Sequence, residues 1–502
     1  MALLEKANRV AHQFDLTDDD VRRCCAHFIN ELEVGLQRRS PAVCQIPTYV
    51  TEVAYGTEKG LSLAVDLGGT NLRVCSVDLC GDSTYTTKQS KITIPTRIMT
   101  AQKASDLFHF IAEQIQHFLQ TYHQELLTPD KAKTAELLSL GFTFSYPAYQ
   151  NSINSGILLR WTKGFDIPDA IGQDVCHLLQ EAINELHLPI KITALVNDAL
   201  GALMFRAYAL PLSETRTSVG AIFGTGTNGV YLEKLHNITK ELEGAYPPAS
   251  NEMFISCEWG SFDNGLLVQP NTKYDTSLDQ VSVNRGNQMF EKRVSGMFLG
   301  ELLRIALVEM HEDPEVGLFR EFREDAATEA DGKIPFFTQW AVDTSILSIA
   351  EADNSGELLP LRQKIADALS IPEFCIGVED AQAVKLIANA IGKRAARLAG
   401  TALASVILKS GRSLVNPHTF PVDEDSNTTN RALIDIAVDG SVVEFYPGFE
   451  AYMRDTWRVI DGIGPAIERR IRIGISKDGS SIGAAIIALI AAQQFQNGSN
   501  VA

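Results

Sequence analysis

Residues 61–79, LSLAVDLGGTNLRVCSVDL, predict two apolar strands joined by a glycine-rich turn. Apolar and β-branched side chains favour strands on both sides of this turn. Gly68 and Gly69 permit a tight turn and leave backbone N–H groups uncovered, and adjacent N–H groups form a concavity that suits phosphate. Asp66 lies at the strand end, where it can face a metal ion or its water. An ordinary β-hairpin is the alternative interpretation of this stretch taken alone.

A second stretch repeats this design. Residues 217–235, TSVGAIFGTGTNGVYLEKL, again place a glycine-rich turn between two apolar strands. Two such hairpins in one chain predict a duplicated architecture, in which two similar domains each offer a phosphate loop to a shared cleft. Gly224, Gly226 and Gly229 also match the dinucleotide pattern G-x-G-x-x-G, but that site requires a helix directly after the loop. Because residues 230–232 continue as a strand, we exclude a dinucleotide-binding site.

The composition is that of a globular protein without a nucleic-acid or membrane partner. The 502 residues allow two or three domains. The net charge of −18 disfavours binding to nucleic acid or an anionic membrane, so an anionic substrate needs a locally positive pocket. The eight cysteines show no C-x-x-C spacing, and the chain shows neither a signal-peptide pattern nor an apolar run of ~18 residues. We therefore expect a cytoplasmic protein without membrane insertion.

Hydrophobic periodicity predicts alternating strands and helices around the two hairpins. This alternation predicts an α/β domain with a mixed sheet, whose pattern restarts at the second hairpin. Residues 411–430 are polar and turn-rich, and we expect a surface loop there. The expected helices are 17–37, with Thr17 as its N-cap, 105–127, 170–186, 286–310, 381–408 and 482–495, and the further expected strands are 88–95, 137–144, 190–196 and 432–438.

Polar residues gather where ligands of α/β sheets bind. Asn197 and Asp198 directly follow the strand expected at 190–196, and such ligands lie off the carboxyl ends of strands. Asp198 is therefore a candidate general base for a hydroxyl group. The alternative interpretation makes it the N-cap of the next helix, and the two roles are compatible. The polar stretch 140–165 holds further candidates to line a cleft, each of which taken alone could be an ordinary loop residue: Ser145, Thr162 and Lys163.

Two more carboxylates lie in largely apolar surroundings. Glu258 follows an apolar strand, and Glu291 lies within the helix expected at 286–310. Either could be an ordinary salt-bridge partner. Carboxylates and amides that converge from several elements suit a polyhydroxylated ligand, because each accepts or donates hydrogen bonds to vicinal hydroxyls.

As a set, these motifs resemble those of eukaryotic ATP-dependent hexokinases, most closely the fungal glucokinase branch, over about residues 60–488. The resemblance implies an actin-like duplicated α/β fold, with two lobes of mixed sheets around a deep cleft. The small lobe would comprise residues 60–196 and 478–502, and the large lobe residues 1–59 and 197–477. The shared motifs are Asp66-Leu-Gly-Gly-Thr-Asn-Leu-Arg73, Phe142-Thr-Phe-Ser-Tyr-Pro147, Trp161-Thr-Lys-Gly-Phe165, Val196-Asn-Asp198, Gly224-Thr-Gly-Thr-Asn228, Glu258-Trp-Gly260, Asp439-Gly-Ser441 and Asp478-Gly-Ser480.

The resemblance also implies an activity, the ATP-dependent phosphorylation of the glucose 6-hydroxyl as the first step of glycolysis, with mannose and fructose as further candidate sugars. Asp198 would take the hydroxyl proton, while Lys163 and Mg²⁺ would offset phosphate charge. Mg²⁺ would be held mainly through the phosphates and water, with Asp66 as a candidate contact. The implied sugar contacts are Ser145, Thr162, Lys163, Asn197, Asp198, Asn228, Glu258 and Glu291. The implied ATP contacts are Asp66, Gly68, Gly69, Thr70, Asn71, Arg73, Gly224, Thr225, Gly226, Thr227, Gly440 and Ser441.

Two competing hypotheses predict different residues at the candidate site. A catalytically impaired, sugar-sensing paralogue should show damage at Asp198, Lys163 or the phosphate loops, and the sequence shows none. An actin-like or chaperone-like ATPase would lack the sugar contacts. Ser481 stands where the family usually has glycine, which predicts a stiffer turn before the last helix. We expect a monomer or a homodimer.

Overall fold

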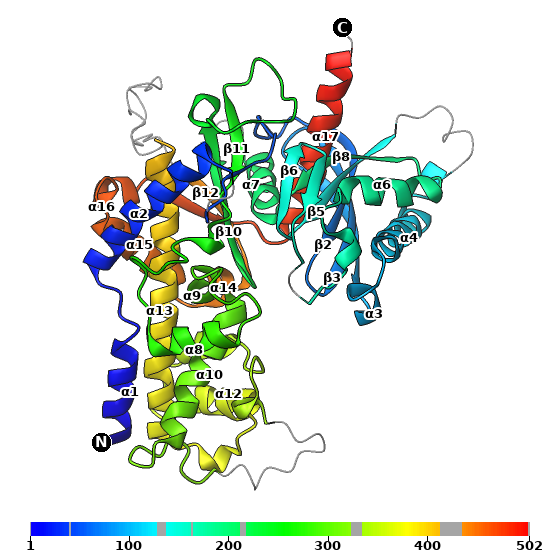
Figure 1. Ribbon diagram of the computed structural model, residues 1–502. Coiled ribbons are helices and arrows are strands. Elements are labelled where there is room, and N and C mark those ends of the chain that lie inside the picture. The colour runs from blue at the N-terminus through cyan, green and yellow to red at the C-terminus, as the bar shows by residue number, and fades with distance from the viewer. Residues whose placement is uncertain are drawn as a thin grey trace.

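The computed structural model contains two mixed β-sheets, which lie in different halves of the molecule (Figure 1). The first sheet has the strand order β4–β3–β2–β5–β8, and the second has the order β1–β11–β10–β9–β12–β13. The structure describes residues 2–39, 42–127, 137–161, 164–210, 217–322, 334–411 and 434–499. The strands of the first sheet are β2 (Lys59–Leu67), β3 (Asn71–Cys80), β4 (Tyr85–Thr93), β5 (Leu138–Phe144) and β8 (Ile190–Val196). Those of the second are β1 (Ile46–Pro47), β9 (Thr217–Phe223), β10 (Thr227–Lys234), β11 (Glu252–Ser256), β12 (Ile434–Asp439) and β13 (Ile471–Ile475).

The two sheets share one topology. In the first, β2, β3 and β4 form an antiparallel meander, after which β5 pairs parallel to β2 and β8 parallel to β5. In the second, β9, β10 and β11 form the meander, β12 pairs parallel to β9, and β13 parallel to β12. Both predicted glycine-rich hairpins are therefore present, at equivalent places, and β10 confirms that a strand follows the second loop. The predicted duplication is confirmed.

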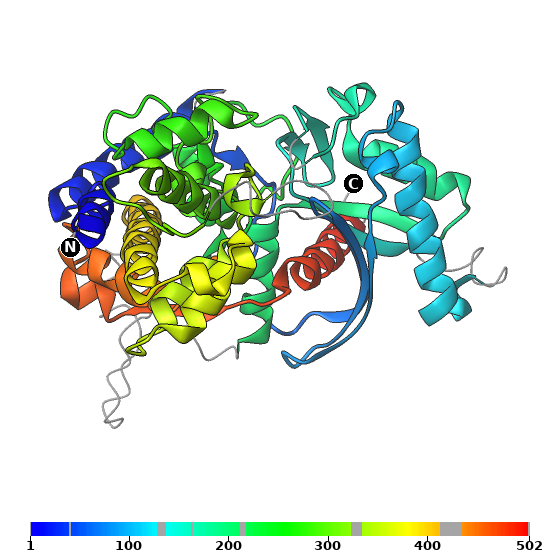
Figure 2. The ribbon, with the colours of Figure 1, turned by 90° about the horizontal axis from the view of Figure 1, so that it is seen from below.

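Two helices form the layers between the sheets. Helix α7 (Asp198–Ala209) follows β8 of the first sheet but packs on β9 and β12 of the second. Helix α17 (Gly479–Ser499) follows β13 of the second sheet but packs on β2, β5 and β8 of the first. The two helices also pack against each other, and each follows a strand of one sheet but packs on the other sheet (Figure 2).

Further helices cover the outer faces. On the first sheet, α4 (Ala104–Tyr122) and α6 (Val175–Glu185) pack against each other and enclose an apolar core. In the other half, α13 (Val378–Lys409) is surrounded by α1 (Ala2–His12), α2 (Asp18–Gln37) and α15 (Phe449–Val459). Its many buried alanines permit this close packing. Thr17 caps α2 as predicted, because its side chain accepts a hydrogen bond from Asp20 N–H.

The remaining described strands are short, and the remaining helices range from single turns to the 17 residues of α10 (Gly296–Glu312). None of the described helices has the length and apolar content that a membrane crossing requires. The short strands are β6 (Ala148–Ser152) and β7 (Ser155–Leu158), and the remaining helices are α3 (Thr96–Met99), α8 (Lys273–Val281), α9 (Glu291–Val294), α10 (Gly296–Glu312), α11 (Ser345–Ala352), α12 (Leu359–Leu369), α14 (Ser441–Phe445) and α16 (Gly464–Glu468).

Three predicted helices differ from the structure. The helix predicted at 105–127 ends at Tyr122, and a separate 3-10 turn follows at Gln124–Leu127. The helix predicted at 286–310 begins only at Glu291 and is broken at Ser295, which is extended and separates α9 from α10. This break turns Gly296 N–H toward the second glycine-rich loop, where it donates to the Gly224 carbonyl at 2.7 Å. The helix predicted at 170–186 begins only at Val175, where Asp174 accepts hydrogen bonds from two N–H groups of the first turn. The predicted loop at 411–430 lies, beyond residue 411, outside the described residues.

Candidate functional site

The candidate base lies where β8 passes into α7. Asn197 is the N-cap of α7, because its side-chain oxygen accepts a hydrogen bond from Leu200 N–H at 2.8 Å. The interpretation of Asp198 as the N-cap is therefore wrong, since the neighbouring amide takes that role. Asp198 is the first residue of the helix, half-buried, and its Oδ2 accepts a hydrogen bond from Ser145 Oγ at 3.4 Å. One carboxylate oxygen thus faces Ser145, a predicted sugar contact that directly follows β5.

Glu258 and Asn228 form a connected polar pair. Asn228 Nδ2 donates to Glu258 Oε1 at 2.9 Å, and Glu258 N–H returns a hydrogen bond to Asn228 Oδ1 at 3.0 Å. Ser256 Oγ also donates to Glu258 Oε1, at 2.7 Å. Glu258 has a left-handed backbone with φ of 55°, which turns its side chain off the end of β11. These bonds fix both side chains, and sequence analysis missed the contribution of Ser256.

Glu291 supports the second glycine-rich loop. Its Oε2 accepts a hydrogen bond from Thr227 N–H at 3.0 Å, and a Cβ at Gly226 would lie 2.8 Å from the same oxygen. Trp259 Nε1 donates to Thr227 Oγ1 at 3.0 Å from the loop that carries Glu258. A side chain at position 226 would therefore displace this carboxylate.

The first glycine-rich loop is tied to the start of α17. Gly68 N–H donates to the Asn71 carbonyl at 3.0 Å and closes the turn, which places Gly69 and Thr70 at its tip. Ser480 Oγ and Ser481 Oγ each donate to Asp66 Oδ2 at 3.3 Å. The predicted departure at Ser481 thus supplies a second hydroxyl to this carboxylate.

An ion pair strengthens the same connection. Arg73 on β3 pairs with Asp478, just before α17, at 2.9 Å. The first loop therefore depends on residues about 400 positions later in the chain, as the separation of 414 positions between Asp66 and Ser480 shows.

The loop that follows β12, at Gly440 and Ser441, closely approaches the second glycine-rich loop. Gly440 follows β12 and has a φ of 120°, a conformation that glycine adopts readily. A Cβ there would lie 2.6 Å from Gly224 N, so the two loops could not approach each other with any side chain at this position. Ser441 begins α14 and is exposed beside them.

The pKa shifts of three carboxyl groups indicate that the glycine-rich loops and the strand ends lie close together. Burial raises the pKa of Asp66, Arg73 opposes this rise, and the charge of Asp198 adds to it. Burial also raises the pKa of Glu258, and Asp198 again adds to that rise. The pKa of Asp439 is raised by burial and then by Asp198. Because all three carboxyls respond to Asp198, the strand ends of both sheets converge on this residue, at a strongly negative place that suits a hard cation.

The raised pKa of Asp439 has a consequence for stability that can be measured. Burial and the charges of Asp198, Asp478 and Glu444 raise its pKa from 3.8 to about 6. Such a group favours the folded state while it is protonated, so stability falls as pH rises from 3.8 to about 6 and then stays lower. Each pH unit is worth about 1.4 kcal/mol. We expect Asp439→Asn to raise the free energy of unfolding at pH 7 by at most about 3 kcal/mol, and by much less near pH 4.

Urea unfolding of both proteins at pH 4 and pH 7 measures this difference. Asp367→Asn on α12 is the control, because Asp367 is exposed and its replacement should change stability little at either pH. An equal effect of Asp439→Asn at both pH values would contradict the raised pKa of Asp439.

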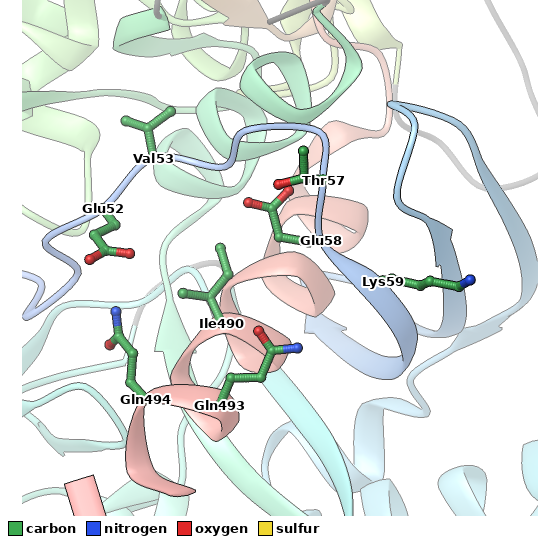
Figure 3. Close-up of a pocket in the computed structure, with 8 residues that line it drawn as sticks. All are labelled: Glu52, Val53, Thr57, Glu58, Lys59, Ile490, Gln493 and Gln494. Atoms are coloured by element: carbon green, nitrogen blue, oxygen red, sulfur yellow. The ribbon is translucent and has the colours of Figure 1, made fainter. Parts of the chain in front are cut away.

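The structure brings most of the predicted residues together, through the hydrogen bonds, close backbone approaches and charge interactions described above. Thr162 and Lys163 lie outside the described residues. The predictions missed Ser256, Asp439, Asp478 and Ser480 as working parts of the site, although the last three stand in or beside the Asp-Gly-Ser motifs that the sequence shows. A separate pocket of about 510 Å³ lies between residues 52–59 and the end of α17, and none of its lining residues belongs to the predicted sugar or ATP contacts (Figure 3).

Comparisons with known proteins agree with this arrangement. Two family models described as hexokinase match residues 6–208 and 218–490. A glucokinase from Aspergillus niger is 48% identical to the chain, and the match covers 98% of both proteins. Glucokinase-1 from Saccharomyces cerevisiae is 38% identical, again over 98% of both.

Solved structures match in the same way. The structure of a hexokinase from Schistosoma mansoni complexed with glucose has a TM-score of 0.79 and 32% identity, and the match covers 97% of this chain and 99% of that one. A crystal structure of another hexokinase has a TM-score of 0.76 and 25% identity, with 98% and 99% covered. The predicted actin-like duplicated fold is confirmed.

Proposed function

The chain belongs to the hexokinase family, and we propose that it transfers a phosphoryl group from ATP to the 6-hydroxyl of glucose. The observation that carries this proposal is the position of Asp198. Its carboxylate lies off the end of β8, bonded to Ser145, and its charge acts on carboxyls that both sheets contribute. An enzyme that phosphorylates a sugar needs a carboxylate at such a meeting point, between the groups that hold the sugar and the loops that hold the phosphates.

We assign the sugar contacts to the polar groups around Asp198. Glu258 and Asn228 would bind vicinal hydroxyls, since their mutual hydrogen bonds fix them in one orientation before the sugar arrives. Ser145, Asn197 and Glu291 would complete the set, together with the predicted contacts Thr162 and Lys163. Asp198 would accept the proton of the 6-hydroxyl as the oxygen attacks phosphorus.

We assign the nucleotide to the glycine-rich loops. The tips at Gly68–Asn71 and Gly224–Thr227 would hold the phosphates with backbone N–H groups, and Arg73 would add positive charge. Gly440 and Ser441 would lie at the adenosine side. The carboxyls of Asp66 and Asp439 fit a Mg²⁺ ion that is bound through water, because this ion retains much of its hydration in proteins. Bound Mg²⁺ would neutralise phosphate charge during transfer.

The same assignment predicts how the two halves work together. We propose lobes of residues 60–196 with 478–502, and of 1–59 with 197–477, that close on the sugar and exclude water. A cytoplasmic location would suit the eight free cysteines and a substrate phosphorylated at the start of glycolysis.

The test is ATP-dependent phosphorylation by the purified protein, measured through ADP release, with glucose, mannose and fructose in parallel. We expect turnover with glucose. A rate with glucose far above that with fructose would identify a glucokinase, and similar rates would identify a general hexokinase. Glucose binding without turnover on any of the three sugars would contradict the proposal and favour a sugar-sensing protein.

A further inference from the structure

A buried carboxylate joins α7 to the second sheet. Asp435, the second residue of β12, is completely buried, and both of its oxygens accept two hydrogen bonds. Arg206 on α7 donates to it twice, from Nε to Oδ2 at 2.7 Å and from Nη2 to Oδ1 at 2.6 Å. Arg472 on β13 and Thr217 on β9 donate once each, at 2.6 Å. Asp435 therefore connects the helix to three neighbouring strands.

The guanidinium of Arg206 occupies a space formed for it. A Cβ at Gly474 on β13 would overlap the guanidinium group of Arg206, so this strand admits the arginine only because position 474 is glycine. The paired hydrogen bonds to Asp435 fix the orientation of the planar guanidinium, which a lysine ammonium could not reproduce. The space beside Gly474 (the seat) therefore fits an arginine side chain and fixes the position of that side chain along β13.

Arg206 and Asp198 lie at opposite ends of the same helix. They are eight residues apart, which corresponds to ~12 Å along α7. Asp435 and Asp439 are four residues apart on β12, which corresponds to ~13 Å along the strand. Arg206 pairs with Asp435, and the charge of Asp198 acts on Asp439. Helix α7 therefore runs antiparallel to β12 where the two pack together, and the spacing of the two residues on the helix matches that of the two residues on the strand. A shift of the helix at one end would move the carboxylate at the other.

We propose that Arg206 is a positioning residue for phosphoryl transfer. By holding α7 in register with β12, it fixes the distance from the Asp198 carboxylate to the loops at 224–227 and 440–441, which β9 and β12 carry. The role rests on the proposed function of Asp198 as the general base. An ion pair between a buried aspartate and a largely buried arginine would thus contribute to catalysis without contacting either substrate.

Arg206→Lys tests this role. Lysine keeps the positive charge within the buried seat but cannot make both hydrogen bonds to Asp435. A misplacement of about 1 Å can cost 10²-fold in rate, so we expect kcat to fall by about 10- to 100-fold. The KM for glucose should change much less than kcat, because Glu258, Asn228, Glu291 and Ser145 are not carried by α7, which contributes only Asn197 and Asp198 to the proposed sugar contacts.

Arg472→Lys is the matched control. Arg472 donates to the same carboxylate but lies on β13, so its replacement perturbs the buried network without releasing α7. Both variants should unfold at lower temperature, and only Arg206→Lys should lower kcat per glucose-binding site. Equal kcat values for the wild type and Arg206→Lys, or equal losses in both variants, would overturn the proposal.

A second variant keeps the test decisive if Arg206→Lys does not fold. Asp435→Asn retains the shape of the seat but removes the charge that holds the guanidinium, and it should also lower kcat with little change in the KM for glucose. Retention of the full kcat by Asp435→Asn would likewise overturn the role. The wild type separates the two proposals, since its failure to phosphorylate glucose would contradict the proposed function itself.

Discussion

Asp198→Asn is expected to lower kcat for glucose phosphorylation by about 10²- to 10⁴-fold, which is the usual contribution of a general base. Asparagine has nearly the same shape, and its Oδ1 can still accept the hydrogen bond that Ala199 N–H donates at 2.9 Å. The variant therefore loses the base and the charge but keeps the start of α7. Glucose binding, measured by calorimetry, should persist because Asn228 and Glu258 are bonded to each other rather than to Asp198.

The stability of the same variant should change in the opposite direction. The charge of Asp198 raises the pKa of Asp66, Glu258 and Asp439, which means that it disfavours their ionised forms. Removing this charge should raise the free energy of unfolding at pH 7, measured in urea. An inactive variant that is also more stable cannot owe its inactivity to misfolding.

Asp174→Asn is the control for the chemistry of the substitution. Asp174 also lies at the start of a helix, where it accepts hydrogen bonds from the first turn of α6, and its further hydrogen bonds come from Ser155 and Gly156, which are not among the predicted site residues. Its replacement should cost stability and leave kcat unchanged. A kcat of Asp198→Asn near that of the wild type would contradict the assignment of Asp198 as the base.

The sequence predicts the parts of this fold that depend on neighbours along the chain. Both glycine-rich hairpins are confirmed, because their apolar runs and turn glycines specify an antiparallel pair locally. Thr17 is confirmed as an N-cap for the same reason, since its partner Asp20 is three residues away. The break at Ser295 was not predictable, because the apolar pattern continues through it and the Gly224 carbonyl that accepts from Gly296 N–H lies far away in the sequence.

For the candidate site, the sequence predicts the residue types at strand ends better than their partners. Asn197 and Asp198 stand out because polar residues directly follow an apolar strand. Nothing local indicates that Asn197, rather than Asp198, caps α7, since both side chains are good caps. The hydroxyls that bond to Asp66 come from Ser480 and Ser481, at the other end of the chain, and no spacing rule predicts contacts over such a distance.

Gly483→Ala is expected to destabilise the protein strongly, although local propensity predicts the opposite. Alanine in place of glycine within a helix normally stabilises it by about 0.5–1 kcal/mol. In α17, however, a Cβ at position 483 would overlap the carbonyl oxygen of Gly201 on α7 and lie 2.7 Å from its Cα. In return, a Cβ at Gly201 would lie 2.8 Å from Ser480 Cα. Backbone atoms cannot rotate away as a side chain can, so the two helices must separate.

Overpacking of this kind costs about 1–3 kcal/mol and occasionally more, which exceeds the gain in propensity. We therefore expect Gly483→Ala to lower the free energy of unfolding in urea by about 1–3 kcal/mol. We also expect it to lower kcat, because α7 carries Asp198 and packs on the second sheet while α17 packs on the first.

Gly356→Ala is the matched control, since a Cβ there meets no atom within 4 Å and the backbone needs no positive φ. It should leave both the free energy of unfolding and kcat near their wild-type values. If Gly483→Ala were as stable and active as Gly356→Ala, the close crossing of α7 and α17 would not fix the two halves of the molecule. The register of Asp198 would then depend on its attachment to the second sheet alone.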